Sequence, residues 1–225
     1  MKYKLTNETK TVDGITLRRI KALKSFDDVK KGDLGGWIER ESNLSHEGDA
    51  WVCGEARVYG DAWVHGNAQV YGDAQVYGDA QVYGDARVYG DARVFGDARV
   101  YGDARVFGDA WVFGKAWVYG DAWVFGKAWV YGDARVYGDA WVYGDAQVFG
   151  DAWVYGDARV SGNARVSGGA QVYGDARVCG KTQVSGDAQV FGNAEVYATE
   201  ELVNLPESDT LSIGGKKYRL VEVKD

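Results

Sequence analysis

The two histidines are the side chains whose ordinary pKa lies near neutrality, so they are the first candidates for acid–base chemistry. His46 stands in the run Ser45-His46-Glu47-Gly48, and His65 takes a position that in most other repeats holds tyrosine or phenylalanine. A general base needs a substrate hydroxyl or amine within hydrogen-bond reach. We expect His65 to replace an outward tyrosine and His46 to be a capping or turn residue; catalysis by His46 is the alternative.

A repeat of six residues positions these and most other side chains. Valine recurs at every sixth position from Val52 through Val196, which gives 25 units. Alanine stands two residues before each valine except at Thr182, and glycine stands two residues after each until Ala198. Four residues of the unit Ala-x-Val-aromatic-Gly-Asp alternate with the period of a strand, and Gly-Asp then breaks the strand. A helix is excluded because 3.6 residues per turn would not keep a six-residue period on one face.

Short strands with a corner on each side are expected to coil and stack on one another. Three strands per turn make a triangular coil of 18 residues with alanine and valine inside, and about eight such coils give a rod about 40 Å long. The pattern over residues 46–202 resembles the left-handed β-helix of the hexapeptide-repeat family. The left hand is implied by this resemblance, because crossover connections in general are right-handed. We therefore predict an all-β fold: a single-stranded left-handed parallel β-helix with small β caps at both ends.

Both ends of the chain depart from the repeat. We expect residues 1–45 to form an N-terminal β cap, with a degenerate first coil at residues 31–39. Residues 46–202 are the β-helix, and residues 203–225 are expected to close it as a β-hairpin cap. Caps are needed because an open end exposes the core and unpaired strand edges.

The N-terminal segments Leu34–Glu39 (Leu-Gly-Gly-Trp-Ile-Glu) and Asn43–Val52 resemble a group of bacterial and phage proteins that are commonly labelled acyltransferases. This resemblance implies an acyl-CoA-dependent reaction with a histidine base, a loop leaving one coil and a cleft between the subunits of a trimer. However, no insertion interrupts the repeat from Val52 to Val196, and small-molecule sites are usually concave. We predict a non-catalytic rigid scaffold or interaction module of phage or prophage type, without cofactor or metal; an acyltransferase is the alternative.

Residues 18 apart should stack, so the outward positions sort into columns. One column runs from His65 through six tyrosines to Phe191, beside a column of tryptophan, arginine and glutamine; we call this surface face C. Its spacing suits ring ladders and cation–π contacts, and exposed aromatic patches often bind partners. The predicted binding surface comprises Tyr83, Tyr101, Trp117, Tyr119, Arg135, Tyr137, Trp153 and Tyr155. A second copy (as in a trimer), another protein or a glycan could occupy it; alternatively, the rings only pack on one another.

The corner positions form columns of carboxylates, and Lys115 interrupts one of them between Asp97 and Asp133. Like charges about 5 Å apart repel each other by on the order of 1 kcal/mol in water. We interpret the lysine as relief of this repulsion, with a line of bound cations along the aspartates as the alternative.

Charge and composition narrow the class of partner and the location. The net charge of −7 argues against a nucleic-acid partner, and no apolar run is long enough for a membrane span or a signal peptide. We expect a cytoplasmic or virion-associated protein without a membrane partner. Cys53 and Cys179 fall in one column seven coils apart, beyond disulfide reach, which predicts two free thiols.

Overall fold

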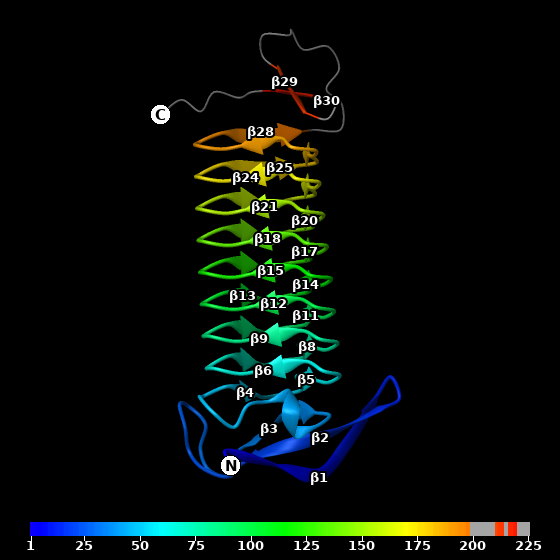
Figure 1. Ribbon diagram of the computed structural model, residues 1–225, viewed down its shortest axis with the longest axis vertical. Helices are drawn as coiled ribbons and strands as arrows, with labels where there is room; N and C mark the ends of the chain where they lie inside the picture. Colours follow the sequence, from blue (N-terminus) through cyan, green and yellow to red (C-terminus); the bar gives the residue numbers. More distant parts are fainter. Residues whose placement is uncertain (199–209, 214–215, 220–225) are drawn as a thin grey trace.

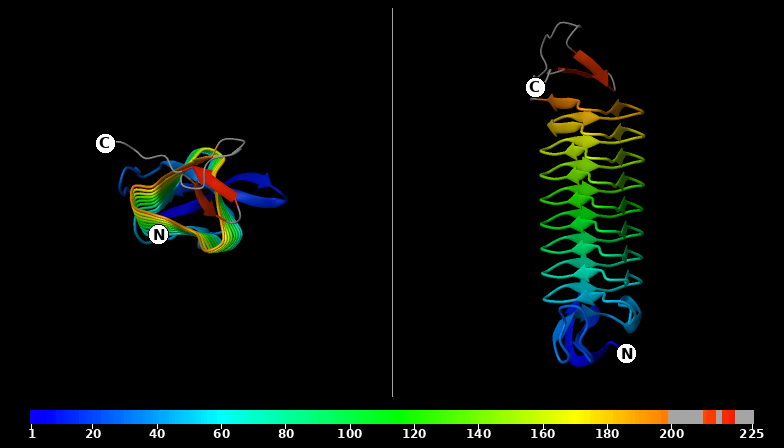
Figure 2. Two further views of the ribbon diagram at one scale, coloured as in Figure 1. Left: turned by 90° about the horizontal axis from the view of Figure 1, so that it is seen from above. Right: turned by 90° about the vertical axis from the view of Figure 1, so that its left-hand side faces the viewer.

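The computed structural model describes residues 1–198, 210–213 and 216–219. Short strands stack one above another along a single long axis, with the N-terminal hairpin at one end (Figure 1). Viewed along this axis, the coils have a triangular outline (Figure 2). Three sheets of parallel repeat strands form the three sides, so the predicted parallel β-solenoid is confirmed.

Each sheet is one face of the rod. Face A consists of β1 (Tyr3–Val12), β2 (Ile15–Ala22), β3 (Leu34–Ile38), β5 (Arg57–Val58), β8 (Gln75–Val76), β11 (Arg93–Val94), β14 (Trp111–Val112), β17 (Trp129–Val130), β20 (Gln147–Val148), β23 (Arg165–Val166) and β26 (Gln183–Val184). Face B consists of β4 (Trp51–Val52), β7 (Gln69–Val70), β10 (Arg87–Val88), β13 (Arg105–Val106), β16 (Trp123–Val124), β19 (Trp141–Val142), β22 (Arg159–Val160), β25 (Arg177–Gly180) and β28 (Glu195–Ala198). Face C consists of β6 (Trp63–Val64), β9 (Gln81–Val82), β12 (Arg99–Val100), β15 (Trp117–Val118), β18 (Arg135–Val136), β21 (Trp153–Val154), β24 (Gln171–Val172) and β27 (Gln189–Val190).

The register of the repeat strands is 18 residues on every face. On face C, Arg99 pairs with Trp117, and Trp117 pairs with Arg135. This register confirms the predicted coil and places residues 18 apart directly above one another.

The interior of each coil is made by the alanine and valine of the repeat. Ala116 and Val118, for example, have no exposed surface. Glycine then turns the chain at the corner, as at Gly120 with a φ of 69°. A Cβ atom there would lie 3.0 Å from the amide nitrogen of Gly138 in the next coil. Glycine is required at this corner by its positive φ and by the close approach of successive coils.

The N-terminal hairpin is continuous with face A. β1 and β2 pair antiparallel around Asp13 and Gly14, which both have positive φ. β2 pairs antiparallel with β3, and β3 pairs in parallel with β5. The 3₁₀ turn η1 (Glu41–Asn43) follows β3, and the described residues contain no α-helix. β3 therefore joins the hairpin to the solenoid as its first strand.

The solenoid has about nine turns, since face B contains nine strands, and the predicted number of about eight was too low. The 25 repeat units alone make just over eight turns, and Ile38 and Leu44, which lie opposite Val58 and Val64, complete the ninth at the N-terminal end. Ile38 and Leu44 are six residues apart, as in the repeat, but each lies 20 residues before its partner instead of 18. The reason is that the step from Leu44 to Val52 contains two extra residues. Ile38 lies within the segment predicted as a degenerate first coil, which the count of about eight did not include.

The C-terminal segment is described only in two short strands. β29 (Thr210–Ile213) and β30 (Lys216–Arg219) pair antiparallel. The rest of the hairpin predicted at residues 203–225, and the predicted end of the solenoid at residue 202, lie outside the described residues. No helix within the described ranges is long and apolar enough to cross a membrane.

Candidate binding face and junction pocket

The tyrosines predicted to form a binding surface lie in one continuous ladder on face C. Tyr101, Tyr119 and Tyr137 stack with ring centroids 4.9 and 4.8 Å apart and planes within 4° of parallel. Tyr83 and Tyr155 extend the ladder on either side at the same spacing. Each ring face is covered by the next ring, so the ladder presents ring edges and hydroxyl groups to solvent. The stacking stabilises the rod and leaves no ring face for a ligand within this run.

The neighbouring column on face C is a stack of arginine and tryptophan. The guanidinium of Arg99 lies 5.2 Å from the ring centroid of Trp117, and that of Arg135 lies 5.0 Å from it. Arg135 also lies 5.1 Å from the ring of Trp153. The indole of Trp117 is thus held between two cations, which is a favourable cation–π arrangement. The structure brings the predicted residues of both columns together on this face.

A shallow groove of about 370 Å³ opens beside this stack, at the corner that precedes face C. It is lined by Asp97, Arg99, Lys115, Trp117, Asp133 and Arg135. Two of the predicted residues, Trp117 and Arg135, line it, whereas Arg99 and Lys115 were not predicted as site residues. Arg99 lies one coil below Trp117, and Lys115 lies two residues before it. This placement relative to Trp117 is the sequence signal that could have identified both residues.

The cations of this groove have no carboxylate partner at ion-pair distance. Within the described residues, no carboxylate oxygen lies within 4.0 Å of the charged nitrogens of Arg99, Lys115 or Arg135. Lys115 thus forms no ion pair with Asp97 or Asp133, and relief of their repulsion stays a prediction. Arg99 and Lys115 are exposed, so their charges face solvent.

His46 lies at the junction between the hairpin and the solenoid, where its imidazole is part of the packing. Its Nδ1 accepts a hydrogen bond of 3.2 Å from the backbone amide of Lys2. Its ring stacks on Tyr3 with centroids 4.3 Å apart, and its Nε2 is buried without a hydrogen-bond partner. Burial lowers the pKa of His46, which favours the neutral imidazole that this hydrogen bond requires. With Nδ1 engaged and Nε2 enclosed, the geometry supports the capping role.

His65 lies at the start of the tyrosine ladder, as expected for a substitute for tyrosine. Its ring stacks on Trp63 at 3.8 Å and on Tyr83 at 4.8 Å. Partial burial lowers its pKa. Neither face of the imidazole is free for a ligand.

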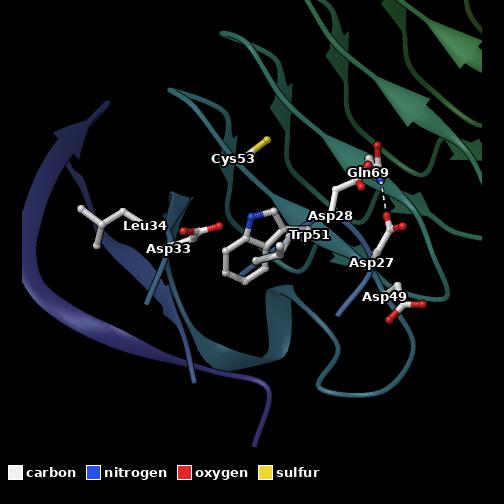
Figure 3. A pocket seen from close by; sticks show the side chains of 9 residues that line it. Asp27, Asp28, Asp33, Leu34, Asp49, Trp51, Cys53 and Gln69 are labelled. Atoms are coloured by element: carbon white, nitrogen blue, oxygen red, sulfur yellow. Dashed lines mark hydrogen bonds between the residues drawn. The ribbon is translucent and has the colours of Figure 1, made fainter. Parts of the chain in front are cut away.

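A pocket of about 380 Å³ lies between the loop after β2 and the first strands of face B (Figure 3). It is lined by Asp27, Asp28, Val29, Asp33, Leu34, Asp49, Trp51, Cys53 and Gln69. The amide of Gln69 donates a hydrogen bond of 3.1 Å to Asp27 and so fastens the loop to the solenoid. The ring of Trp51 packs edge-on against Phe26, with centroids 5.4 Å apart.

The chemistry available in this junction pocket is limited. Burial raises the pKa of Cys53, so its thiol stays protonated at neutral pH and is a weak nucleophile. Within the described residues, no group of three or more histidine, cysteine, aspartate or glutamate side chains could hold a metal ion. Cys53 and Cys179 are both free, which confirms the prediction of two thiols.

The repeat itself identifies the family. The family described as YdcK beta solenoid repeat matches residues 50–66, 68–84, 80–96, 86–100, 98–114, 128–144, 158–173 and 170–186. The chain is a hexapeptide-repeat β-solenoid protein. The matched segments lie on all three faces of the rod, within β4 to β26.

Similar proteins share parts of this solenoid. The uncharacterized acetyltransferase YdcK of Escherichia coli (strain K12) is 39% identical over 59 residues, which cover 23% of this chain and 18% of that protein. The matched region thus spans less than a fifth of the length of that curated relative. Among solved structures, the UDP-N-acetylglucosamine acyltransferase of Francisella novicida aligns with 13% identity and a TM-score of 0.47, covering 71% of this chain and 64% of that one. LpxA from Acinetobacter baumannii aligns with 8% identity and a TM-score of 0.31, covering 74% and 68%.

Proposed function

We propose that this protein is a non-catalytic, rigid β-solenoid that acts as a scaffold or interaction module, with face C as its interaction face. The observation that carries this proposal is the unbroken 18-residue register from β4 to β28, in which no coil carries an inserted loop. A rod of this kind holds its ends at a fixed separation. The rod geometry supports a role as a spacer, and we propose that it serves in the cytoplasm or in a virion of phage or prophage origin.

Face C is favoured as the interaction face because its ladder reaches further than those of the other faces. On face C the aromatic column continues through Tyr173 to Phe191, whose rings still stack at 5.3 Å. The corresponding columns change to Ser161 on face B and Ser167 on face A. A second copy of the chain, as in a trimer, or another macromolecule would meet the most continuous surface on face C.

Acyl transfer is the second candidate function, and the likeness to the E. coli acetyltransferase favours it. In this chain His46 would have to be the base, since His65 is held between two rings. The enclosed Nε2 of His46 counts against this role.

Native mass spectrometry with and without acetyl-CoA, together with an acetyl-transfer assay, tests the proposal. We expect no acetyl-CoA adduct and no transfer, and we expect small-angle scattering to show an elongated particle. His46→Asn, which keeps a hydrogen-bond acceptor, and His65→Tyr are matched variants. Acetyl transfer that is lost in His46→Asn but kept in His65→Tyr would overturn the non-catalytic role.

A further inference from the structure

We propose that the groove at the corner of face C binds acidic oligosaccharides, with uronic acid carboxylates on Arg99 and Arg135 and sugar hydroxyls on Asp97 and Asp133. This inference rests on the proposed role of face C as the interaction face. Its first support is the lining of the groove, which combines three cations with two carboxylates on a chain whose net charge is −7.

The two arginines are prepared for carboxylate binding. Their guanidinium groups lie 5.2 and 5.0 Å from the ring centroid of Trp117, one from the coil below it and one from the coil above. Stacking on the ring restricts the side chains while the N–H groups at their edges keep their hydrogen-bonding capacity. No carboxylate among the described residues lies within 4.0 Å of either guanidinium. Each can therefore form the paired hydrogen bonds by which arginine holds a carboxylate.

Lys115 gives this groove a charge that the equivalent place on face B lacks. Arg105 and Arg159 on face B also stack on tryptophans, at 4.8 and 4.9 Å. The corner column beside them holds only aspartates, namely Asp103, Asp121, Asp139 and Asp157. Face B thus repeats the arginine–tryptophan contacts in an acidic surrounding. An anion is attracted to the groove of face C and not to its counterpart.

The spacing of the arginines fits a chain of sugars. Arg99 and Arg135 lie two coils apart, which is about 10 Å at the strand spacing of a sheet. Carboxylates on alternate residues of an extended polyuronate repeat over two sugar units. The groove volume of about 370 Å³ lies within the range of roughly 300–1,000 Å³ that is usual for ligand sites. A trisaccharide whose first and third carboxylates meet the two arginines is therefore a suitable occupant.

Asp97 and Asp133 distinguish a sugar from other polyanions. Their carboxylates can only accept hydrogen bonds, and sugar hydroxyls are donors. A phosphodiester chain or an acidic peptide would bring further negative charge next to these two aspartates with few hydroxyls to offer. The mixed lining therefore favours a ligand that carries both carboxylates and hydroxyls.

Isothermal titration calorimetry with oligogalacturonate tests this inference on the full chain. We expect saturable binding at low salt that weakens as salt is raised, and no binding of the fully methyl-esterified oligosaccharide. R99Q/R135Q and K115D should each weaken binding by about tenfold or more, because they remove charge-assisted contacts. The fold accepts these changes, since Gln81 and Gln171 occupy the arginine column and Asp97 the corner column.

R105Q/R159Q on face B is the matched control and should leave the affinity unchanged. Absence of oligogalacturonate binding would overturn the inference, and so would equal weakening by the face B control. Binding of polyglutamate or single-stranded DNA with the same affinity would overturn it as well, because it would indicate attraction by charge alone. None of these results bears on acetyl transfer, so the failure of this inference and that of the proposed function are distinguishable.

Discussion

The ammonium group of Lys2 donates a hydrogen bond of 2.7 Å to the carbonyl oxygen of Ala50, in the place that a backbone amide takes one coil later. There, the amide of Trp51 donates to the carbonyl of Ala68 at 2.9 Å. The Lys2 ammonium also reaches the carbonyl of Gly48 at 3.2 Å. A side chain from the segment before β1 thus replaces the coil that is missing below face B.

Asn43 has the same function below face C. Its Nδ2 donates to the carbonyls of Gly60 and Ala62 at 3.0 and 2.9 Å. Below face A, the backbone of β3 supplies the donors directly, with the amide of Trp37 bonded to the carbonyl of Ala56 at 2.9 Å. Each face of the first complete coil is therefore closed by hydrogen-bond donors, which protects this end from pairing with another strand.

Lys2→Met should destabilise this end of the solenoid. Methionine keeps most of the length of the side chain but removes the donor to the buried carbonyl of Ala50 and to the carbonyl of Gly48, at a cost of about 1–3 kcal/mol. Hydrogen exchange of the β4 amides should show the loss, because a solenoid opens coil by coil. Lys4→Met, at an exposed position at the start of β1, is the control. Unchanged β4 protection in Lys2→Met would show that the ammonium does not close the coil.

Acid should loosen the same junction through His46. Burial holds the folded-state pKa of His46 below its ordinary value of about 6.5. Below about pH 6.5 the unfolded state therefore binds more protons than the folded state, and stability falls as the pH is lowered towards the folded-state pKa. Protonation also removes the lone pair with which Nδ1 accepts from Lys2.

Denaturant unfolding at pH 7.5 and pH 5 measures this effect. His46→Asn should reduce the loss of stability on acidification, because its amide oxygen accepts the Lys2 hydrogen bond without titrating. His65→Tyr, which restores the aromatic column, should retain the part of the loss that belongs to His46. An identical pH dependence in His46→Asn and the unchanged protein would contradict the assignment.

The solenoid could be predicted from sequence because each residue meets the same environment every 18 residues. The pairing of Arg99 with Trp117 follows from that period alone. The N-terminal closure could not be predicted in the same way, because Lys2 lies in a segment that has no repeat. The carbonyls that it contacts are 46 and 48 residues away in the sequence. A buried lysine just before the first strand carries no sequence signal of its partners.

The candidate site on face C could be predicted in part. The period placed Trp117 and Arg135 in one column, which the structure confirms. The orientation of the rings could not be predicted, because an outward ring can either cover its neighbour or stay free. The groove also depends on Lys115 at the corner, and a long side chain there can reach the neighbouring column.

Tyr119→Ser should weaken the ladder of face C without changing the fold. The ring of Tyr119 stacks on Tyr101 and Tyr137, and each stacked pair contributes about 0.5–1.5 kcal/mol. We expect a loss of roughly 1–3 kcal/mol in the free energy of unfolding, measured in denaturant. Serine fits this position, as Ser161 shows on face B.

Ser161→Tyr is the converse test on face B. The new ring would lie above Tyr143 and should raise the free energy of unfolding by about 0.5–1.5 kcal/mol. If neither variant changes the denaturant midpoint, the stacking of outward rings does not contribute to the stability of the rod.

Three glycine variants distinguish two contributions to stability, namely the cost of positive φ for a residue with a side chain and the cost of a Cβ atom where successive coils approach closely. Gly120→Ala combines a φ of 69° with a Cβ atom 3.0 Å from a backbone nitrogen, which cannot move aside. Gly14→Ala has a φ of 82° but no atom of the described residues within 4 Å, so it bears only the cost of the left-handed conformation, about 1–2 kcal/mol. Gly169→Asn stands at a corner without positive φ, where Asn163 occurs one unit earlier, and its Cβ would lie 2.9 Å from the carboxylate of Asp187, a flexible side chain that can move aside. It should stabilise by about 0.4–1 kcal/mol through the unfolded state.

Thermal unfolding of the three glycine variants ranks these contributions. We expect the lowest midpoint for Gly120→Ala, a smaller decrease for Gly14→Ala and an unchanged or higher midpoint for Gly169→Asn. The reason for the first difference is that successive coils meet backbone to backbone at Gly120 and Gly138. Equal midpoints for Gly120→Ala and Gly14→Ala would mean that positive φ alone explains the glycine at each corner, and that the coils can separate enough to admit a methyl group.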